Sequence, residues 1–255
     1  MTLQVLTDPL FYATAIPAVI ILGLAKGGFS GVGVVAVPLM ALAVSPVLAA
    51  SIILPILIVQ DVVGVWSFRR TWDARVLKQM LPGAVVGVLA GYGLAAFVRP
   101  AAVELCVGLI SILFAVQRLR PQGQVQTNAP STTWRGSVAG VASGFTSQIA
   151  HAGGPPFQIY VLPLGLSRDA FIGTSSIFFA IVNWIKVPAY LALGQLTAQT
   201  LSTALVLLPL AIGSTFAGVW LIRRVPTERF YLVIYILLTV VGAKLVWDGA
   251  VGLLV

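Results

Sequence analysis

The sequence predicts an all-α integral membrane protein made of two membrane repeats with opposite orientation. Hydrophobic residues make up 59% of the chain and charged residues only 9%, whereas soluble domains carry about a quarter charged residues. Apolar stretches follow one another along the whole chain, which excludes a soluble domain with one anchor or a cleaved signal peptide. The same order of lengths, two short stretches followed by three long ones, occurs in each half of the chain. We expect about 8–10 membrane helices, including short broken or re-entrant segments.

Five apolar stretches precede a polar break in the middle of the chain. They cover residues 10–25, 31–44, 47–67, 77–98 and 101–119. A segment of about 20 apolar residues can cross a hydrocarbon core of about 30 Å, so the last three stretches are long enough to span. The first two are shorter. We therefore expect this short pair to form either a broken helix or a re-entrant hairpin.

Five further apolar stretches follow the break PQGQVQTNAPSTT. They cover residues 134–149, 153–166, 169–191, 197–222 and 228–247, again two short and three long. LPGAVVGVLAG (81–91) aligns with LPLAIGSTFAG (208–218) through identical Leu, Pro, Ala, Ala and Gly residues. The sequence thus predicts a first membrane repeat over 1–120, a polar cytoplasmic linker over 121–133 and a second repeat over 134–255, together forming one membrane domain.

Basic residues in the loops predict that the two repeats face opposite ways, because cytoplasmic loops collect Lys and Arg. In the first repeat they follow the third stretch. In the second repeat the corresponding loop, GQLTAQT, is uncharged, and the basic residues come one loop later. These residues are Arg69, Arg70, Arg75 and Lys78 in the first repeat and Arg223, Arg224 and Arg229 in the second. We expect a multi-pass protein of the bacterial inner membrane with both termini on the periplasmic side, an architecture typical of secondary transporters.

Each short pair is interrupted by glycine and proline, at LAKGGFSGVG (24–33) and at HAGGPP (151–156). Unpaired backbone N–H groups inside a membrane need a partner, which protein, water or a ligand can supply. A helix starting near Gly31 or Pro155 would direct its positive dipole end inward and favour an anion. Lys26 stands at the first break. His151, the single histidine, stands at the second; it is either a core histidine or the group for a proton-coupled step, since its ordinary pKa is about 6.5.

Polar residues within the third stretch of each repeat are further candidates. Asp61 and Lys186 are intramembrane charges, which are functional by default, with a structural ion pair as the alternative. Gln60 and Asn183 could bind an oxyanion or join helices. Hydroxyl groups near the start of these stretches could receive an anion or cap the helix. The predicted substrate-binding residues are Lys26, Gly27, Gly28, Ser30, Gly31, Ser51, Gln60, Asp61, Gln148, His151, Gly153, Gly154, Thr174, Ser175, Asn183 and Lys186.

Four segments carry a resemblance to a known family. They are LAKGGFSGVGVVAVPLM and SPVLAASIILPILIVQD in the first half, and GFTSQIAHAGGPPFQIYVLPLGL and RDAFIGTSSIFFAIVNWIKVPAYLALG in the second. Over nearly the whole chain the sequence resembles the sulfite exporter TauE/SafE family of bacterial membrane transporters. The resemblance implies a secondary transporter of a small anion, often a sulfur-containing one such as sulfite or an organosulfonate. Many relatives have glycine at the position of His151.

Two other functions fit parts of the sequence. Gly28-Phe29-Ser30-Gly31 and Ala150-His151-x-x-Gly154 match the motifs of rhomboid-type intramembrane proteases, in which a serine and a histidine form the reactive pair. GxSG is short, however, and the chain contains 25 glycines. A non-transporting membrane subunit is the second alternative, but this function does not explain the presence of Asp61, Lys186 and His151.

The expected partners follow from the transporter interpretation. We predict no enzyme activity, a small anionic substrate, contact with membrane lipid, and protons as the coupling ion. One histidine and one cysteine do not make a metal site, so neither a metal nor a cofactor is predicted. The net charge of +8 reflects loop arginines that orient the chain, and it does not indicate nucleic-acid binding.

Overall fold

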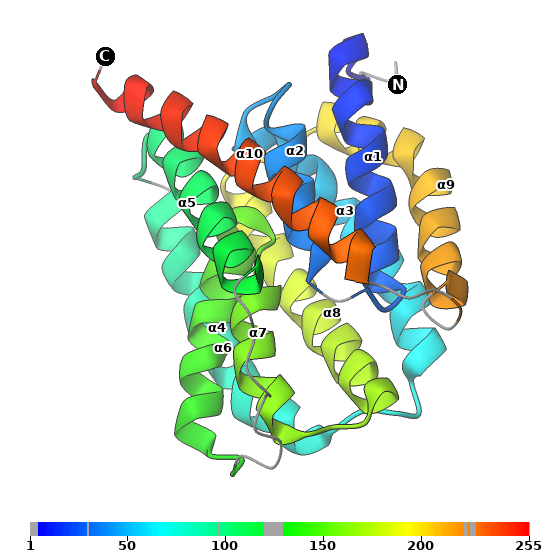
Figure 1. The fold of residues 1–255 in the computed structure, drawn as a ribbon. Coiled ribbons are helices and arrows are strands. Elements are labelled where there is room, and N and C mark those ends of the chain that lie inside the picture. The colour runs from blue at the N-terminus through cyan, green and yellow to red at the C-terminus, as the bar shows by residue number, and fades with distance from the viewer. Residues whose placement is uncertain are drawn as a thin grey trace.

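The computed structural model describes residues 5–29, 31–95, 97–119, 130–221, 224 and 228–254. Over these residues the chain is helical, with no strands, and forms ten α-helices and two short 3₁₀ helices (Figure 1). The first half contains α1 (Pro9–Lys26), η1 (Val32–Val35), α2 (Ala36–Met40), α3 (Pro46–Phe68), α4 (Ala74–Ala95) and α5 (Pro100–Leu119). The second half contains α6 (Thr133–Ala150), α7 (Gly154–Val161), η2 (Leu162–Leu164), α8 (Arg168–Ala192), α9 (Ala198–Leu221) and α10 (Glu228–Leu254).

Seven of the described helices are long and apolar enough to cross a membrane, which confirms a multi-pass membrane protein. They are α1, α3, α4, α5, α8, α9 and α10. Helix α1 was expected to be too short, but it has 18 residues and therefore reaches about 27 Å at 1.5 Å per residue. Helix α6 also has 18 residues but is not among the seven, because Gly, Ser and Thr make up much of its sequence.

Serine caps begin the two long helices that carry polar residues, α3 and α8. The Ser45 hydroxyl accepts from the Leu48 amide at 3.3 Å, and the Ser167 hydroxyl accepts from the Ala170 amide at 3.3 Å. Pro46 follows the first cap, where its missing N–H leaves no helical hydrogen bond unmade. These caps fix where α3 and α8 begin, and hence the depth at which Asp61 and Lys186 lie.

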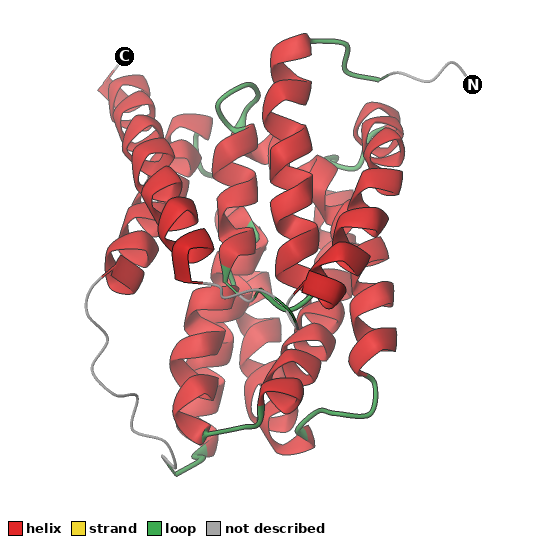
Figure 2. Cartoon of the chain, turned by 45° about the vertical axis from the view of Figure 1, so that its right-hand side comes forward, coloured by secondary structure: helices red, strands yellow, loops and turns green. Residues whose placement is uncertain are grey.

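The helices pack in pairs that join the two halves of the chain. Helix α4 lies along α6, α1 along α9, α5 along α10 and α3 along α8, with further contacts between α3 and α9 and between α4 and α8 (Figures 1 and 2). One buried apolar cluster joins α1, α2, α3, α5 and α10, and a smaller one joins α4, α7 and α8. Helix α1 begins and α10 ends at the same end of the bundle (Figure 1).

Glycines let α4 and α6 approach each other closely. Gly83, Gly87 and Gly91 recur every fourth residue on α4, and Gly136, Gly140 and Gly144 do so on α6. Residues four apart lie on one face of a helix. A Cβ atom added at Gly87 would collide with the backbone of α6 at Val141 and Phe145. The crossing therefore depends on small residues, as is common between membrane helices.

Candidate functional site

Two interrupted helices end inside the bundle and form the framework of the site. Helix α1 ends at Lys26, and the chain turns through Gly28 and Gly31, which have positive φ angles of 133° and 94°. Helix α6 ends at Ala150, and His151 follows in the left-handed conformation with φ 50°. The next helices start at Val32 and Gly154. The second break therefore begins a helix where the sequence predicts it, whereas the first begins with a 3₁₀ turn before α2.

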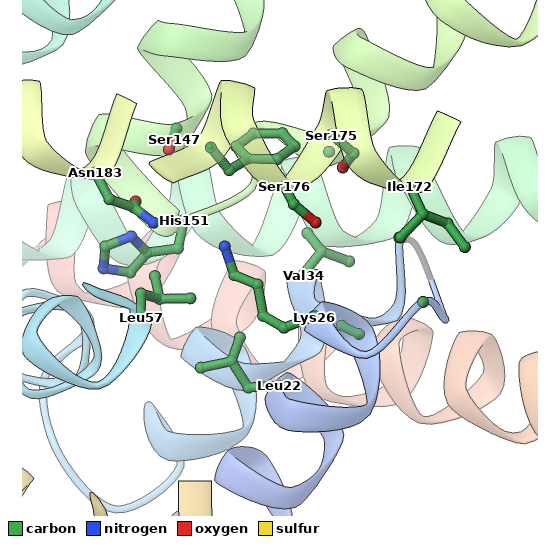
Figure 3. A pocket seen from close by; sticks show the side chains of 16 residues that line it. Leu22, Lys26, Val34, Leu57, Ser147, His151, Ile172, Ser175, Ser176 and Asn183 are labelled. Carbon is green, nitrogen blue, oxygen red and sulfur yellow. The ribbon is translucent and has the colours of Figure 1, made fainter. Parts of the chain in front are cut away.

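A cavity of about 90 Å³ lies between the two breaks (Figure 3). It is smaller than the pockets of roughly 300–1,000 Å³ that hold drug-sized ligands, so it suits a small solute. The residues around it come from α1, the first break, α3, α6, the second break, α7 and α8. They are Leu22, Ala25, Lys26, Gly28, Gly31, Gly33, Val34, Leu57, Ser147, His151, Gly154, Ile172, Ser175, Ser176, Phe179 and Asn183.

Lys26, Asp61 and Asn183 form a hydrogen-bonded group at this cavity. The Lys26 ammonium forms an ion pair with one carboxylate oxygen of Asp61. The other carboxylate oxygen accepts from Asn183 Nδ2 at 2.6 Å. Asp61 is only 3% exposed, and a buried charge is tolerated when it is paired and hydrogen-bonded. The group ties α1, α3 and α8 together beside the cavity.

Lys186 on α8 and His151 at the end of α6 form a second polar group, which also contacts Ala50 on α3. Lys186 Nζ lies 2.6 Å from His151 Nδ1 and donates to the carbonyl and hydroxyl oxygens of Ser147 at 3.2 and 3.1 Å. An ammonium only donates, so Nδ1 accepts, and the ring hydrogen belongs to Nε2. Nε2 then donates to the carbonyl oxygen of Ala50 at 2.9 Å. With Lys186 as the donor, the imidazole in this network is neutral.

The charges around the cavity do not cancel. Asp61 neutralises Lys26, whereas the hydrogen-bond partners recorded for Lys186 in the described chain are Ser147 and His151, neither of them a carboxylate. Lys186 is fully buried. A buried cation without a carboxylate partner is costly, and an anion nearby lowers that cost. The arrangement therefore favours a negatively charged ligand.

The predicted site residues divide into three groups. Those that line the cavity are Lys26, Gly28, Gly31, His151, Gly154, Ser175 and Asn183. Asp61 and Lys186 lie behind the lining and reach it through hydrogen bonds. The residues that do not line the cavity are Gly27, Ser51, Gln60, Gln148, Gly153 and Thr174. Ser30 lies outside the described residues.

The residues away from the cavity have other contacts. Ser51 and Thr174 donate to carbonyls one turn earlier, of Val47 and Ala170, and so neither caps its helix. Gln60 Nε2 donates to the Ala211 carbonyl at 3.3 Å and so joins α3 to α9. Gly27 packs against Gly218, and the Gly153 carbonyl accepts from the Ser143 hydroxyl. Gln148 lines a different cavity.

Two polar or aromatic lining residues were not predicted, namely Ser147 and Phe179. Ser147 precedes His151 by one helical turn and could have been found from that spacing. Ser176, one of the hydroxyl residues expected near the start of the third stretch, also lines the cavity. Phe179 carries no polar signal, yet its ring lies 5.7 Å from Lys26 Nζ, a cation–π distance. The alternative for Asp61 and Lys186 was a structural ion pair, but Asp61 pairs with Lys26 instead.

One comparison with known proteins identifies a family. The family model of the sulfite exporter TauE/SafE matches residues 15–245, which include both breaks and every helix that lines the cavity. A comparison with curated proteins gives no match. Because the family model covers nearly the whole chain, the protein belongs to the sulfite exporter TauE/SafE family.

Proposed function

We propose that the protein is a secondary transporter that moves a small, sulfur-containing anion such as sulfite or an organosulfonate across the bacterial inner membrane by alternating access. The observation that carries the proposal is the cavity between the two breaks, where two lysines meet one carboxylate. The description of the family as sulfite exporters supports the choice of anion. The excess positive charge supports an anion over a neutral or cationic solute.

Each part of the site has a task in binding an oxyanion. Lys186 supplies the positive charge, and Ser175, Ser176 and Asn183 supply side-chain donors. The glycines of the two breaks leave the backbone uncovered, so that amide groups can approach the oxygens closely. Gly31 has φ 94°, a conformation that other residues rarely adopt. The walls of the cavity come from both halves of the chain, so a movement between the halves would change which side it faces.

The pairing of helices supports two inverted repeats, 1–120 and 134–255, as the parts that move. If α1 to α5 are exchanged with α6 to α10, the contact of α1 with α9 becomes that of α6 with α4. The contact of α3 with α9 becomes that of α8 with α4, while α3 with α8 and α5 with α10 map onto themselves. This is the contact pattern of a pseudo-twofold axis, as in inverted-repeat transporters. The loop arginines separately support termini on the periplasmic side.

The protease alternative is less well supported. In a Ser–His pair one ring nitrogen must accept the serine proton. Here His151 Nε2 contacts the Ala50 carbonyl and Nδ1 contacts Lys186. Both nitrogens are therefore engaged by groups other than a serine. A non-transporting subunit would not need a charged cavity between two helix breaks.

Binding of sulfur oxyanions should raise the thermal stability of the detergent-purified protein. A ligand at 100 times its dissociation constant stabilises a fold by about 2.7 kcal/mol. We expect the melting temperature to rise with sulfite, thiosulfate, sulfate or an organosulfonate, and less with small carboxylates. The shift should disappear in Lys186→Gln, which removes the uncompensated charge.

A paired change provides the matched control for this screen. Lys26→Ala with Asp61→Asn removes the ion pair at the cavity, and Lys244→Ala with Asp248→Asn removes an ion pair on the exposed side of α10. The first double variant should lose the anion-dependent shift and the second should keep it. If no anion shifts the melting temperature of the unaltered protein, the proposed substrate class is wrong.

The Lys186–His151 contact supports protons as the coupling ion. Lys186 Nζ and His151 Nδ1 share one hydrogen bond, so a second proton on the ring would break it. The charged and titratable groups around the ring are Lys186 and Tyr190 on α8, Lys26 on α1 and Asp61 on α3. We expect anion transport in proteoliposomes to depend on pH through the proton on the His151 ring. His151→Gln should remove that dependence, and an unchanged pH profile in this variant would contradict proton coupling through His151.

A further inference from the structure

A second cavity, of about 240 Å³, lies beyond the polar groups of the first. It is enclosed by the start of α3, the end of α4, the start of α5 and the ends of α6 and α8. Its walls are mostly apolar, and they include Ala50, Cys106, Gln148 and Tyr190. None of these residues lines the first cavity.

The two cavities lie at successive depths along the same pair of helices. On α3, Val47 and Ala50 line the second cavity and Leu57 lines the first. On α8, which packs against α3, Asn183 lines the first cavity and Tyr190 the second. Seven residues separate the two levels on each helix, which corresponds to about 10 Å at 1.5 Å per residue. The cavities therefore lie at different depths along α3 and α8.

A thin layer of side chains and backbone separates the cavities. His151 faces the first cavity, and its Nε2 donates to the carbonyl of Ala50, a residue of the second. The rings of Tyr190 and His151 are stacked at 6.1 Å, and the Tyr190 hydroxyl donates to the Gln148 carbonyl at 3.1 Å. The His151 ring thus connects a wall residue of the second cavity to the lining of the first.

Gln148 indicates that the second cavity holds polar solute or water. Its side chain is only 4% exposed, yet its Oε1 has no hydrogen-bond partner among the described residues. A buried carbonyl oxygen without a donor is costly, and such groups in native proteins are nearly always satisfied by protein or water. A cavity filled with lipid tails would leave this oxygen unsatisfied. Because Gln148 borders this cavity, a small rotation of its amide would let water there supply the donor.

We propose that the second cavity is the other half of the translocation path, and that the His151–Ala50 hydrogen bond with the Tyr190 ring is the closed gate between the halves. The occupant is the transported anion with its water. This inference rests on the proposed function, because it assigns a path to the same substrate.

The native cysteine reports on this path. Cys106 is the single cysteine of the sequence, is exposed and lines the second cavity. Ser175 lines the first cavity. A Ser175→Cys substitution in a Cys106→Ser background therefore places a single cysteine there, for comparison with Cys106. The probe is a membrane-impermeant methanethiosulfonate that carries a sulfonate group, applied to right-side-out and inside-out vesicles. We expect it to modify each cysteine from one face only, and the two from opposite faces.

The gate is tested by removing the histidine ring. His151→Gly suits the positive φ at this position and removes the contacts to Ala50 and Lys186. We expect the impermeant reagent to reach Cys106 from the previously closed face at least about tenfold faster. The same variant with Cys106→Ser provides the background measurement. An unchanged rate would overturn the gate.

The outcomes for the path are separable from those for the substrate. If Cys106 reacts with a lipid-soluble maleimide but with the charged reagent from neither face, the second cavity faces lipid and the inference is wrong. Modification of both cysteines from the same face also overturns it. These measurements need no substrate. Cysteines modified from opposite faces, together with no anion in the stability screen, would support the path and reject the proposed substrate class.

Discussion

Replacing Asp61 with alanine should lower the free energy of unfolding by about 3–5 kcal/mol, the usual effect of removing one partner from a buried ion pair. Lys26 would then keep its charge at a mostly buried position, with a side chain only 13% exposed. Asn183 would lose the carboxylate to which it donates at 2.6 Å. The cost comes from the unpaired partners left behind, more than from the loss of attraction.

The comparison that separates these causes is a paired substitution. Lys26→Met with Asp61→Asn removes both charges of the pair, and it should recover most of the stability lost in Asp61→Ala. Asp248→Ala breaks the exposed pair with Lys244 on α10, whose side chains are 39% and 56% exposed, and should cost less than about 1 kcal/mol. The measurement is unfolding of the micelle-bound protein by a denaturing detergent. Equal losses for Asp61→Ala and Asp248→Ala would mean that the Lys26–Asp61 pair is hydrated.

Replacing Gly87 with alanine should destabilise the protein by about 3 kcal/mol, at the upper end of overpacking effects. The added methyl group would meet the backbone of α6 at the Val141 carbonyl and the Phe145 amide. A flexible side chain could turn aside, but helix backbone cannot. Helices α4 and α6 would have to separate, and α6 carries Ser147 and ends beside His151. Transport should therefore fall along with stability.

Gly93 on the same helix is the matched control. A Cβ atom there meets nothing within 4 Å, and alanine favours a helix over glycine by up to about 1 kcal/mol. Gly93→Ala should thus be neutral or slightly stabilising, opposite in sign to Gly87→Ala. The measurement is the melting temperature of each variant in the same detergent. Equal melting temperatures would contradict the close crossing of α4 and α6.

Much of the fold could be predicted because apolar stretches and their interruptions determine the helices of a membrane protein. The predicted stretch 47–67 differs from α3 (Pro46–Phe68) by one residue at each end. The stretch 31–44 was less accurate: the structure has a 3₁₀ turn followed by α2 (Ala36–Met40), since apolar composition does not distinguish these helix types. Helix α10 continues to Leu254, beyond the predicted end at 247, and the Lys244–Asp248 pair spans that point one turn apart.

The sequence predicted how deep in the membrane the site residues lie, but not toward which side of its helix each side chain points. Lys26, His151 and Asn183 meet at one cavity because the two breaks and the third stretches lie at similar depths. Which way a side chain points around its helix depends on packing against helices distant in the sequence. Gln60, next to Asp61, therefore contacts α9 instead of the cavity. The Ser51 hydroxyl donates to a carbonyl of its own helix. Any serine in a helix can make this bond, so the local sequence does not predict it.

The backbone at His151 implies a conflict between stability and activity. Among the described residues it is the one residue other than glycine with a positive φ, at 50°. That conformation costs a residue with a Cβ about 1–2 kcal/mol, and sparsely populated backbone conformations cluster at functional sites. Glycine would be the easier choice, yet it has no ring to join Lys186 to Ala50. Selection for stability alone would therefore favour glycine at this position, and the proposed function gives a reason to keep the imidazole.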